Sequence, residues 1–358
     1  MIYNFGVRNF LSFKEGIDVS FELNKNCPDF ISQGKGCTTL LCVKGNNASG
    51  KTNVLKALLF LHEFCRDSFT KINFEESINV KPFYDSKEPI DFYMEYSNYN
   101  GGERLIYELT ISEGKVQRES LSEKKKSGNI DLLFVREENE VTECIKELDE
   151  LQSIKLRSNA SISSTAFQHE INLMMDMFGI FGFKLQDVKN NIQVKQASSF
   201  FYSNLASFEF TKEIILKADT GIEDIELKKS EENKGEYYPL FHHTTASGIR
   251  KLTFKEESSG TQRLYLVLWN YFIALEFGML LIADEFDIHL HPHIAPLLLD
   301  LFTNPEINPK GAQFIFTTHD TQLMDRMGKY RTFLVNKEDN ESYGYRLDEL
   351  STKKPSKL

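Results

Sequence analysis

Hydrophobic and polar positions alternate in two stretches of the first third of the chain. Residues 1–23 contain "IYNFGVRNF" and "IDVSFEL", and residues 90–122 contain "IDFYMEYSNY" and "RLIYELTISEG". A period of two is typical of β-strands that bury one face. Asn100-Gly101-Gly102, between the later two runs, is a good hairpin turn. The pattern predicts an antiparallel β-subdomain at the N-terminus.

Short apolar runs next to helical patterns occur elsewhere in the chain. The run "TTLLCVKG" (38–45) precedes "KTNVLKALLFLHEFCRD", which has a helical pattern. After residue 249 we expect a helix over 261–277 with Gly278 at its C-terminus, and a strand over 279–284. A helix over "HIAPLLLDLF", a strand "AQFIFTT" (312–318) and two short strands in "YRTFLVNK" and "YGYRLDEL" follow. Continuous apolar strands alternating with helices predict an α/β core.

The middle of the chain has a different composition. It opens with "SEKKKSGN" and is rich in Glu, Lys, Ser and Asn, with an amphipathic piece "EINLMMDMFGIFGF" and a helix–turn–strand pattern in "FTKEIILKADTGIEDIELKK". There are no sustained heptads, which disfavours a long coiled coil. We therefore expect an N-terminal lobe over 1–122, a mainly helical insertion over 123–235 and a C-terminal lobe over 236–358.

Bulk properties restrict the class of protein. The formal net charge of −10 argues against a protein that coats nucleic acid, although a local basic patch is compatible with it. Five cysteines at no metal or disulfide spacing, and an N-terminus without the apolar core of a signal peptide, predict a cytoplasmic location. The apolar stretch 264–283 is interrupted by Asn270, Glu276 and Gly278, so we expect core elements and no membrane span.

A phosphate-binding loop is the most specific motif. "GNNASGKT", Gly45–Thr52, fits G-x-x-x-x-G-K-[ST] and lies between a predicted strand and a predicted helix. Gly45 and Gly50 permit a tight loop whose backbone N–H groups can hold a polyphosphate. Lys51 is expected to reach the β- and γ-phosphate oxygens and Thr52 to ligate Mg²⁺. The sequence therefore predicts ATP and Mg²⁺ as ligands, held by residues Gly45, Asn46, Asn47, Ala48, Ser49, Gly50, Lys51 and Thr52.

The segment "LIADEFDIHLHPHIAP" (281–296) allows two interpretations. As the end of a buried strand it supplies Asp284 as a metal-organising acid and Glu285 as the group that polarises the attacking water, facing the other side of the strand. Alternatively, its acids and its histidines could form a transition-metal site. Pro292 and the alternating spacing of the histidines His289, His291 and His293 favour the first interpretation.

Two further motifs flank this strand. "SSGTQRL" (258–264) opens the preceding helix with small hydroxyl and glycine residues, which makes a second anion site. Since one loop already holds the phosphates, the economical explanation is that Ser259, Gly260 and Gln262 serve a nucleotide bound by a partner copy. His319 ends the strand "FIFTTHD" and is a candidate for contact with a γ-phosphate. The alternative is an ordinary surface histidine.

With these motifs in order, the sequence resembles ABC-type ATPase heads of the SMC/RecF/OLD group, and within it the ATPases of bacterial anti-phage and abortive-infection systems. The resemblance runs from "FGVRNFLSF" through "GNNASGKTNVLKAL" and "ESSGTQRL" to "LLIADEFDIHLHPHIAPLLLDLF" and "GAQFIFTTHDTQLMD". It implies a P-loop fold in which Lys51 and Thr52 are Walker A residues, Asp284 and Glu285 Walker B residues, and His319 the switch histidine. The chain departs from the family pattern at Thr261, where many relatives have glycine, and at His291, where transporters and SMC heads have aspartate. The best assignment for the Q-loop is 80–85.

The resemblance also implies a homodimer or larger homo-oligomer with ATP sandwiched between the Walker A loop of one subunit and the signature of the other. We expect an ATP-driven regulator of a separately encoded effector, because the roughly forty residues after His319 are too few for a nuclease domain. The alternative is a RecF-like ATPase that clamps DNA, which the net charge disfavours. A transporter subunit and a nuclease are less well supported.

Overall fold

The computed structural model describes residues 1–97, 102–178, 186–187, 193–218, 221–230, 235–287, 290 and 293–351. The chain divides into two compact units. Unit 1 comprises Met1–Leu185 and Gln313–Leu358, and unit 2 comprises Gln186–Ala312. The units meet at 185/186 and 312/313, whereas the boundaries predicted from the sequence lie at 122/123 and 235/236.

Unit 1 contains a seven-stranded sheet in the order β2-β1-β4-β5-β6-β7-β8. Each neighbouring pair is antiparallel. This confirms the strands that alternation predicts in residues 1–23 and 90–122, while most of the expected turn at Asn100–Gly102 lies outside the described residues. The strands are β1 (Ile2–Arg8), β2 (Ile17–Ser20), β4 (Ile90–Ser97), β5 (Arg104–Ser112), β6 (Lys115–Lys124), β7 (Ile130–Glu137) and β8 (Glu140–Cys144).

A second group of strands in unit 1 has the parallel arrangement of an α/β core. Strand β3 (Leu40–Lys44) pairs in parallel with β14 (Gln313–Thr317) and with β15 (Thr332–Glu338). Strand β16 (Glu341–Arg346) then pairs with β15 as an antiparallel hairpin. All five residues of β14 and four of the five in β3 are buried, which explains their continuous apolar sequence.

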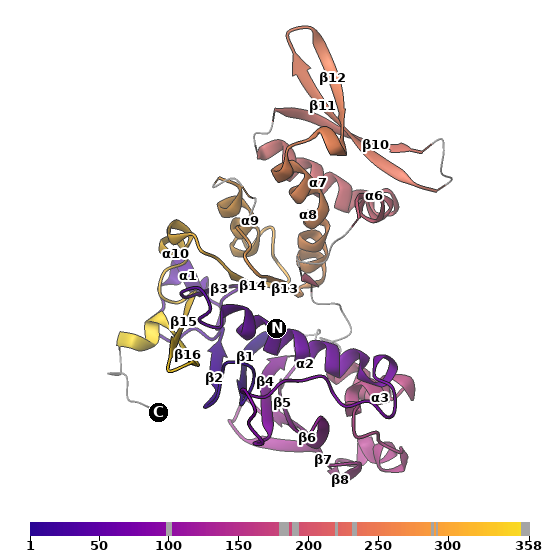
Figure 1. Cartoon of the computed structure of the whole chain (residues 1–358), viewed down its shortest axis with the longest axis vertical. Helices are drawn as coiled ribbons and strands as arrows, with labels where there is room; N and C mark the ends of the chain where they lie inside the picture. Colours follow the sequence, from indigo (N-terminus) through magenta and orange to yellow (C-terminus); the bar gives the residue numbers. More distant parts are fainter. Residues whose placement is uncertain are drawn as a thin grey trace. The chain divides into compact units, whose positions relative to one another are not determined.

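Helix α2 (Lys51–Lys71) connects these two groups of strands. It starts directly after the glycine-rich loop and packs against both β14 and β1 (Figure 1). Phe60 of this helix stacks on Phe92 of β4, with 4.7 Å between ring centroids. The remaining helices of unit 1 are short: α1 (Asp29–Ser32), η1 (Lys146–Ser153), α3 (Ile162–Gln168), α4 (Asn172–Met177), α10 (Thr321–Met327) and η3 (Leu347–Ser351).

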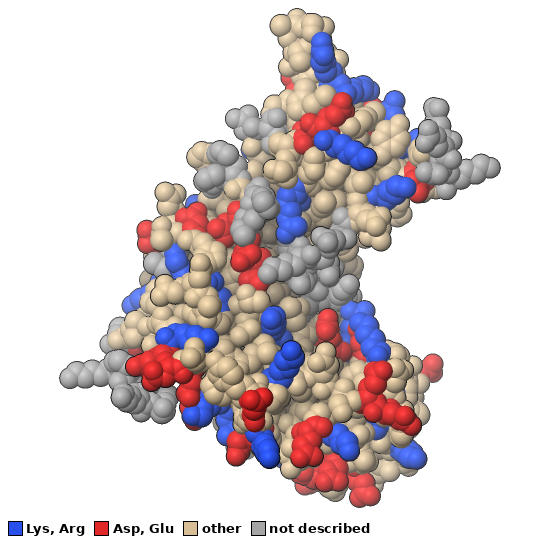
Figure 2. Space-filling view, in the orientation of Figure 1, with Lys and Arg blue, Asp and Glu red and all other residues tan. Residues whose placement is uncertain are grey.

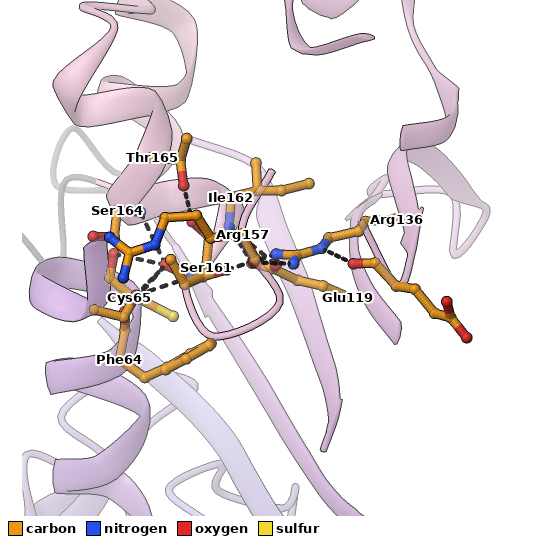
Figure 3. A network of polar contacts seen from close by, with 12 residues as sticks. Phe64, Cys65, Glu119, Arg136, Arg157, Ser161, Ile162, Ser164 and Thr165 are labelled. Atoms are coloured by element: carbon orange, nitrogen blue, oxygen red, sulfur yellow. Dashed lines mark hydrogen bonds and ion pairs between the residues drawn. The ribbon is translucent and has the colours of Figure 1, made fainter. Parts of the chain in front are cut away.

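A buried polar network holds the C-terminal half of α2 (Figure 3). Arg136 of β7 and Glu119 of β6, both fully buried, form an ion pair at 3.0 Å. Glu119 also accepts hydrogen bonds from Tyr107 at 2.9 Å and from the Ile162 amide at 3.0 Å. Burial raises the pKa of the Glu119 carboxyl, and Arg136, the amide and Tyr107 oppose that rise. The network thus joins the sheet to the start of α3.

The same network reaches the backbone of α2 and of the segment that follows it. Ser161 donates from Oγ to the Phe64 carbonyl at 3.1 Å. Arg157 donates to the carbonyls of Phe69, at 2.8 Å, and of Ile72. Asn159 donates to the Asn73 carbonyl at 2.7 Å. Of these acceptors, the Phe69 carbonyl lies in the last turn of α2, where carbonyl groups have no intrahelical partner.

Unit 2 contains a helical group and a separate three-stranded antiparallel sheet, β10 (Ile222–Lys229), β11 (Tyr237–Thr245) and β12 (Gly248–Thr253). Helix α6 packs on β11 and α7 on β10 (Figure 1). Helix α8 packs on α6 and α7 and also on β13, a short strand that pairs with β9 in parallel. The remaining bounds are β9 (Gln186–Asp187), α6 (Val194–Ser203), α7 (Leu205–Lys217), η2 (Phe254–Glu256), α8 (Ser259–Phe277), β13 (Leu280–Ala283) and α9 (Ile294–Thr303).

Residues 123–235, predicted as a mainly helical insertion, also contain β7, β8 and β10. The Lys- and Ser-rich composition at the start of this segment belongs to a hairpin turn, in which the Lys125 amide donates to the Asn129 carbonyl at 2.8 Å. The chain then returns to the N-terminal sheet as β7, so that sheet continues past residue 122. Among the described residues, no helix is long and apolar enough to cross a membrane.

Candidate nucleotide site

The loop Gly45–Thr52 connects the carboxyl end of β3 to the first turn of α2, as the motif predicts. Ala48 and Gly50 have positive φ angles of 62° and 111°. A Cβ atom on Gly45 would lie 2.0 Å from the Val335 carbonyl oxygen, so only glycine fits there. Both glycines of the motif are therefore explained by backbone geometry.

Lys51 is buried and bends back over its own loop. Its Nζ donates to the Gly45 carbonyl at 2.9 Å and to the Asn46 carbonyl at 3.0 Å. Ser49 is also buried, and its Oγ has no hydrogen-bond partner among the described atoms. An arriving phosphate would thus find an ammonium group already inside the loop, whose carbonyl partners it can exchange for phosphate oxygens.

His319 lies near the same edge of the parallel strands as the loop. Strands β3 and β14 run in parallel with Val43 opposite Thr317, so their carboxyl ends meet at one edge. Lys44, next to the loop, donates to the Asp320 carbonyl at 3.2 Å. The His319 side chain is exposed. The fold of unit 1 therefore brings together the phosphate loop and the histidine that the sequence singles out.

The signature segment forms the start of α8 in unit 2. Ser258 is the N-cap and accepts a hydrogen bond from the Thr261 amide at 3.2 Å. Ser259 is exposed at the first helical position, and Gln262 donates to the Glu257 carbonyl at 2.8 Å. The helix ends at Gly278 with φ of 64°, as predicted for a C-terminal glycine. The 19-residue helix α8 thus presents Ser259 and Gly260 at an open N-terminus.

The two acids of the Walker B motif follow β13, whose four residues are all buried. The strand ends at Ala283, so Asp284 and Glu285 lie in the turn after it, and strand alternation does not set their directions as predicted. Asp284 is buried at 8% exposure and Glu285 is half-buried. Glu285 adopts a positive φ of 53°, a costly conformation for a residue with a side chain and one that clusters at functional sites.

The alternative interpretation of residues 281–296 is a transition-metal site, and only part of that segment is described. Within the described residues, no group of three or more His, Cys, Asp or Glu side chains could hold a metal ion. His289, His291 and Pro292 lie outside the described residues, and His293 is exposed at the start of α9.

The segment assigned to the Q-loop contacts the loop between β1 and β2. The Lys81 carbonyl accepts from the Leu11 amide at 3.1 Å, and the Phe83 amide donates to Asn9 Oδ1 at 3.3 Å. Sequence reasoning did not predict that this β1–β2 loop also reaches the start of α2, where Asn53 donates to Ser12 Oγ at 2.8 Å. The "NFLSF" run that supplies Ser12 was visible in the sequence, but its contacts are long-range.

Comparison with known structures identifies the fold class. Over 98% of this chain and 99% of the other, the fold matches a structure described as "Crystal structure of the SmcHead bound to the C-winged helix domain of ScpA", with 15% identity and a TM-score of 0.57. A structure described as "SMC head domain from Thermotoga maritima" covers 96% of this chain and 98% of its own at 13% identity, with a TM-score of 0.47. The protein has the SMC-head-like α/β fold of P-loop ATPases, which confirms the predicted fold class.

The family follows from sequence. The chain belongs to the family described as "AAA domain, putative AbiEii toxin, Type IV TA system", which matches residues 40–325. The matched region includes the phosphate loop, the signature segment, the Walker B acids and His319. No curated protein matches the chain in sequence.

Proposed function

We propose that the protein binds and hydrolyses ATP as an ABC-type ATPase. The observation that carries this proposal is the loop of unit 1, in which Lys51 lies inside a glycine loop at the start of a 21-residue helix, with His319 near the same edge of the strands. Backbone donors at the start of α2 and the ammonium group of Lys51 suit a polyphosphate.

Each residue then has a role in the proposed reaction. The sequence motifs assign Mg²⁺ to the Thr52 hydroxyl and the Asp284 carboxylate, each an oxygen donor of the kind that this ion prefers, and the ion would neutralise phosphate charge when bound. Glu285 accepts a proton from the attacking water and His319 donates a hydrogen bond to the γ-phosphate. Asn46, Asn47, Ala48 and Ser49 contribute the backbone of the cradle.

We further propose that two copies of the chain share each ATP. Ser259, Gly260 and Gln262 at the open start of α8 would contact the γ-phosphate of a nucleotide held by the Walker A loop of the other copy. ATP then favours the closed dimer, and hydrolysis favours the open one.

Subunit complementation tests the shared site. Lys51→Ala and Ser259→Arg should each be inactive alone, because every dimer lacks either all Walker A lysines or all signatures. Mixing the two should restore hydrolysis at about a quarter of the wild-type sites, since a mixed dimer has one site with both parts intact. A mixture that stays inactive although the subunits exchange would contradict the composite site.

The biological role we propose is regulation of a separately encoded effector in a bacterial anti-phage or abortive-infection system. The family description, which names a toxin of a type IV toxin–antitoxin system, supports this role. Phage plating on cells that carry the chain with its neighbouring genes tests it. Protection that is present with the wild type and lost with Lys51→Ala is expected. Equal plating with and without the wild-type genes would reject the role.

A DNA clamp is the alternative function, and surface charge bears on it. On the face drawn in Figure 2, Lys and Arg side chains are interspersed with Asp and Glu. Among the described residues, surface charges of opposite sign also form ion pairs, such as Arg118 with Glu137 at 3.3 Å and Lys14 with Glu341 at 2.9 Å. An ATP-dependent clamp would instead show duplex binding that weakens steeply with salt. Such a salt slope in the presence of Mg-ATP would favour the clamp.

A further inference from the structure

Three segments that are far apart in the sequence meet at the phosphate loop. Ser342, at the start of β16, is buried and donates from Oγ to the Ser49 carbonyl at 2.6 Å. The Ser342 amide donates to the Ser12 carbonyl in the β1–β2 loop at 2.7 Å. Ser342 therefore contacts both the phosphate loop and the β1–β2 loop of the N-terminal sheet.

The contacts close around Gly50. A Cβ atom at that position would lie 2.7 Å from Ser342 Oγ and 2.9 Å from Ser12 Oγ, so the two hydroxyl groups pack directly on the glycine. Asn53, in the first turn of α2, donates to Ser12 Oγ at 2.8 Å. The last glycine of the motif is thus required both by its positive φ of 111° and by the two serines.

The β1–β2 loop is itself firmly held. Phe10 and Phe13 exchange backbone hydrogen bonds at 2.8 and 2.9 Å. Asn9 adopts a positive φ of 51° and donates from its side chain to the Glu88 carbonyl at 2.6 Å. Ser12 is consequently a fixed point against which Ser342 can be placed.

Holding the Ser49 carbonyl has a consequence for phosphate binding. The peptide group between Ser49 and Gly50 is planar and trans, so its C=O and N–H point in opposite directions. When Ser342 holds the Ser49 oxygen, the direction of the Gly50 N–H is fixed as well. That amide is one of the backbone donors that a phosphate loop offers to its ligand.

We propose that Ser342 is a positioning residue for nucleotide binding, which sets the Gly50 amide toward the phosphates by holding the Ser49 carbonyl on the side of the hairpin. Ser12 is the fixed support of this arrangement. The inference rests on the proposed function, because it assumes that the loop binds ATP.

Affinity for fluorescent N-methylanthraniloyl ATP, measured with Mg²⁺ by titration, tests the role of Ser342. Ser342→Ala should weaken binding about three- to tenfold, as expected for one lost hydrogen bond. KM for ATP should rise by the same factor, while kcat at saturating ATP changes less. Ser342→Thr, which keeps the hydroxyl group, should restore part of the affinity.

Ser161→Ala is the matched control. Ser161 is also buried in unit 1 and also donates to a backbone carbonyl. Its acceptor, the Phe64 carbonyl, lies in the C-terminal half of α2 and not at the phosphate loop. This variant should lose stability without losing affinity. Wild-type affinity in Ser342→Ala, or an equal loss of affinity in Ser161→Ala, would overturn the role of Ser342 and leave the proposed function standing. Failure of the wild-type chain to bind the analogue would overturn the proposed function and this inference with it.

Discussion

The two ends of helix α2 differ in how their polar groups are satisfied. At its N-terminus the loop Gly45–Thr52 has two residues with positive φ, and the Oγ of buried Ser49 has no partner among the described atoms. At its C-terminal half, side chains from residues 157–164 satisfy the backbone of the helix and of the segment after it. The N-terminal end therefore offers donors to a ligand. At the C-terminal end, side chains of the same chain already bind the backbone groups.

The difference indicates which interactions stabilise this fold. Arg136, Glu119 and Tyr107 lie fully buried and bind one another, so the C-terminal half of α2 is fixed by interactions that solvent does not screen. The phosphate loop is held at the Ser49 carbonyl by Ser342 and packs at Gly50 against Ser12. A helix that is anchored at one end can carry a binding loop at the other without losing its position.

The largest effect is expected from Arg136→Met, which leaves the buried Glu119 carboxylate without its counter-charge. Breaking a buried pair in this way costs about 3–5 kcal/mol, and urea unfolding measures the loss. Burial already raises the pKa of Glu119, and the variant loses the opposing effect of Arg136. Because the folded-state pKa lies above the unfolded value, the stability loss should grow as the pH rises above the ordinary range of a glutamate carboxyl.

Arg118→Met is the control for that prediction. Arg118 directly precedes Glu119 on β6. Its side chain is 41% exposed and pairs with Glu108 and Glu137 at the surface. Its removal should cost less than about 1 kcal/mol. Similar losses in the two variants would show that the buried network has no special role.

Lys51→Ala should have the opposite profile, with little effect on unfolding and a large effect on ligand affinity. Lys51 donates to the Gly45 and Asn46 carbonyls of its own loop, which an alanine there leaves to be hydrated. Loss of a charged donor to phosphate should weaken ATP binding about 10- to 100-fold by calorimetry. Lys56→Ala, an exposed lysine on the same helix, should bind normally. Unchanged affinity in Lys51→Ala would contradict the assignment of the loop.

Ala48→Gly should give the smallest effect, and a stabilising one. Ala48 has a φ of 62°, a conformation that costs an alanine about 1–2 kcal/mol and a glycine almost nothing. Part of that gain is offset by the greater freedom of glycine in the unfolded chain, so we expect about 0.5 kcal/mol by urea unfolding. Ala57→Gly, inside α2, should destabilise instead. A loss of stability in Ala48→Gly would mean that the loop is not strained at this position.

Local patterns predicted much of the fold, because strands and helices with one buried face show a regular spacing. The strands β1, β2, β4 and β5 lie within runs identified by spacing alone, and the helices α2 and α8 extend slightly beyond the predicted 51–67 and 261–277. Strands β11 and β12 were not predicted, since β12 is exposed at nearly every position and has no apolar alternation. The hairpin of β6 and β7 was cut by the predicted boundary because its turn is charged.

The candidate site shows a similar limit. The phosphate loop, the start of α8 and the place of His319 follow from motifs that are contiguous in sequence. Ser342 and Ser12 could not be found in this way, because they are 330 residues apart and meet only through the register of β16. The positive φ of Glu285 was not predicted either, because the expected strand 279–284 ends at Ala283 and leaves Glu285 in the turn that follows.

The central claim is that two copies of the chain close around ATP, and the light-scattering mass of Glu285→Gln tests it most directly. This variant should bind Mg-ATP without activating water, so the closed dimer accumulates. The account predicts a doubled mass with Mg-ATP, a monomer mass without it, and no increase when Ser259→Arg is added to the same chain. A mass that is independent of nucleotide would contradict the account.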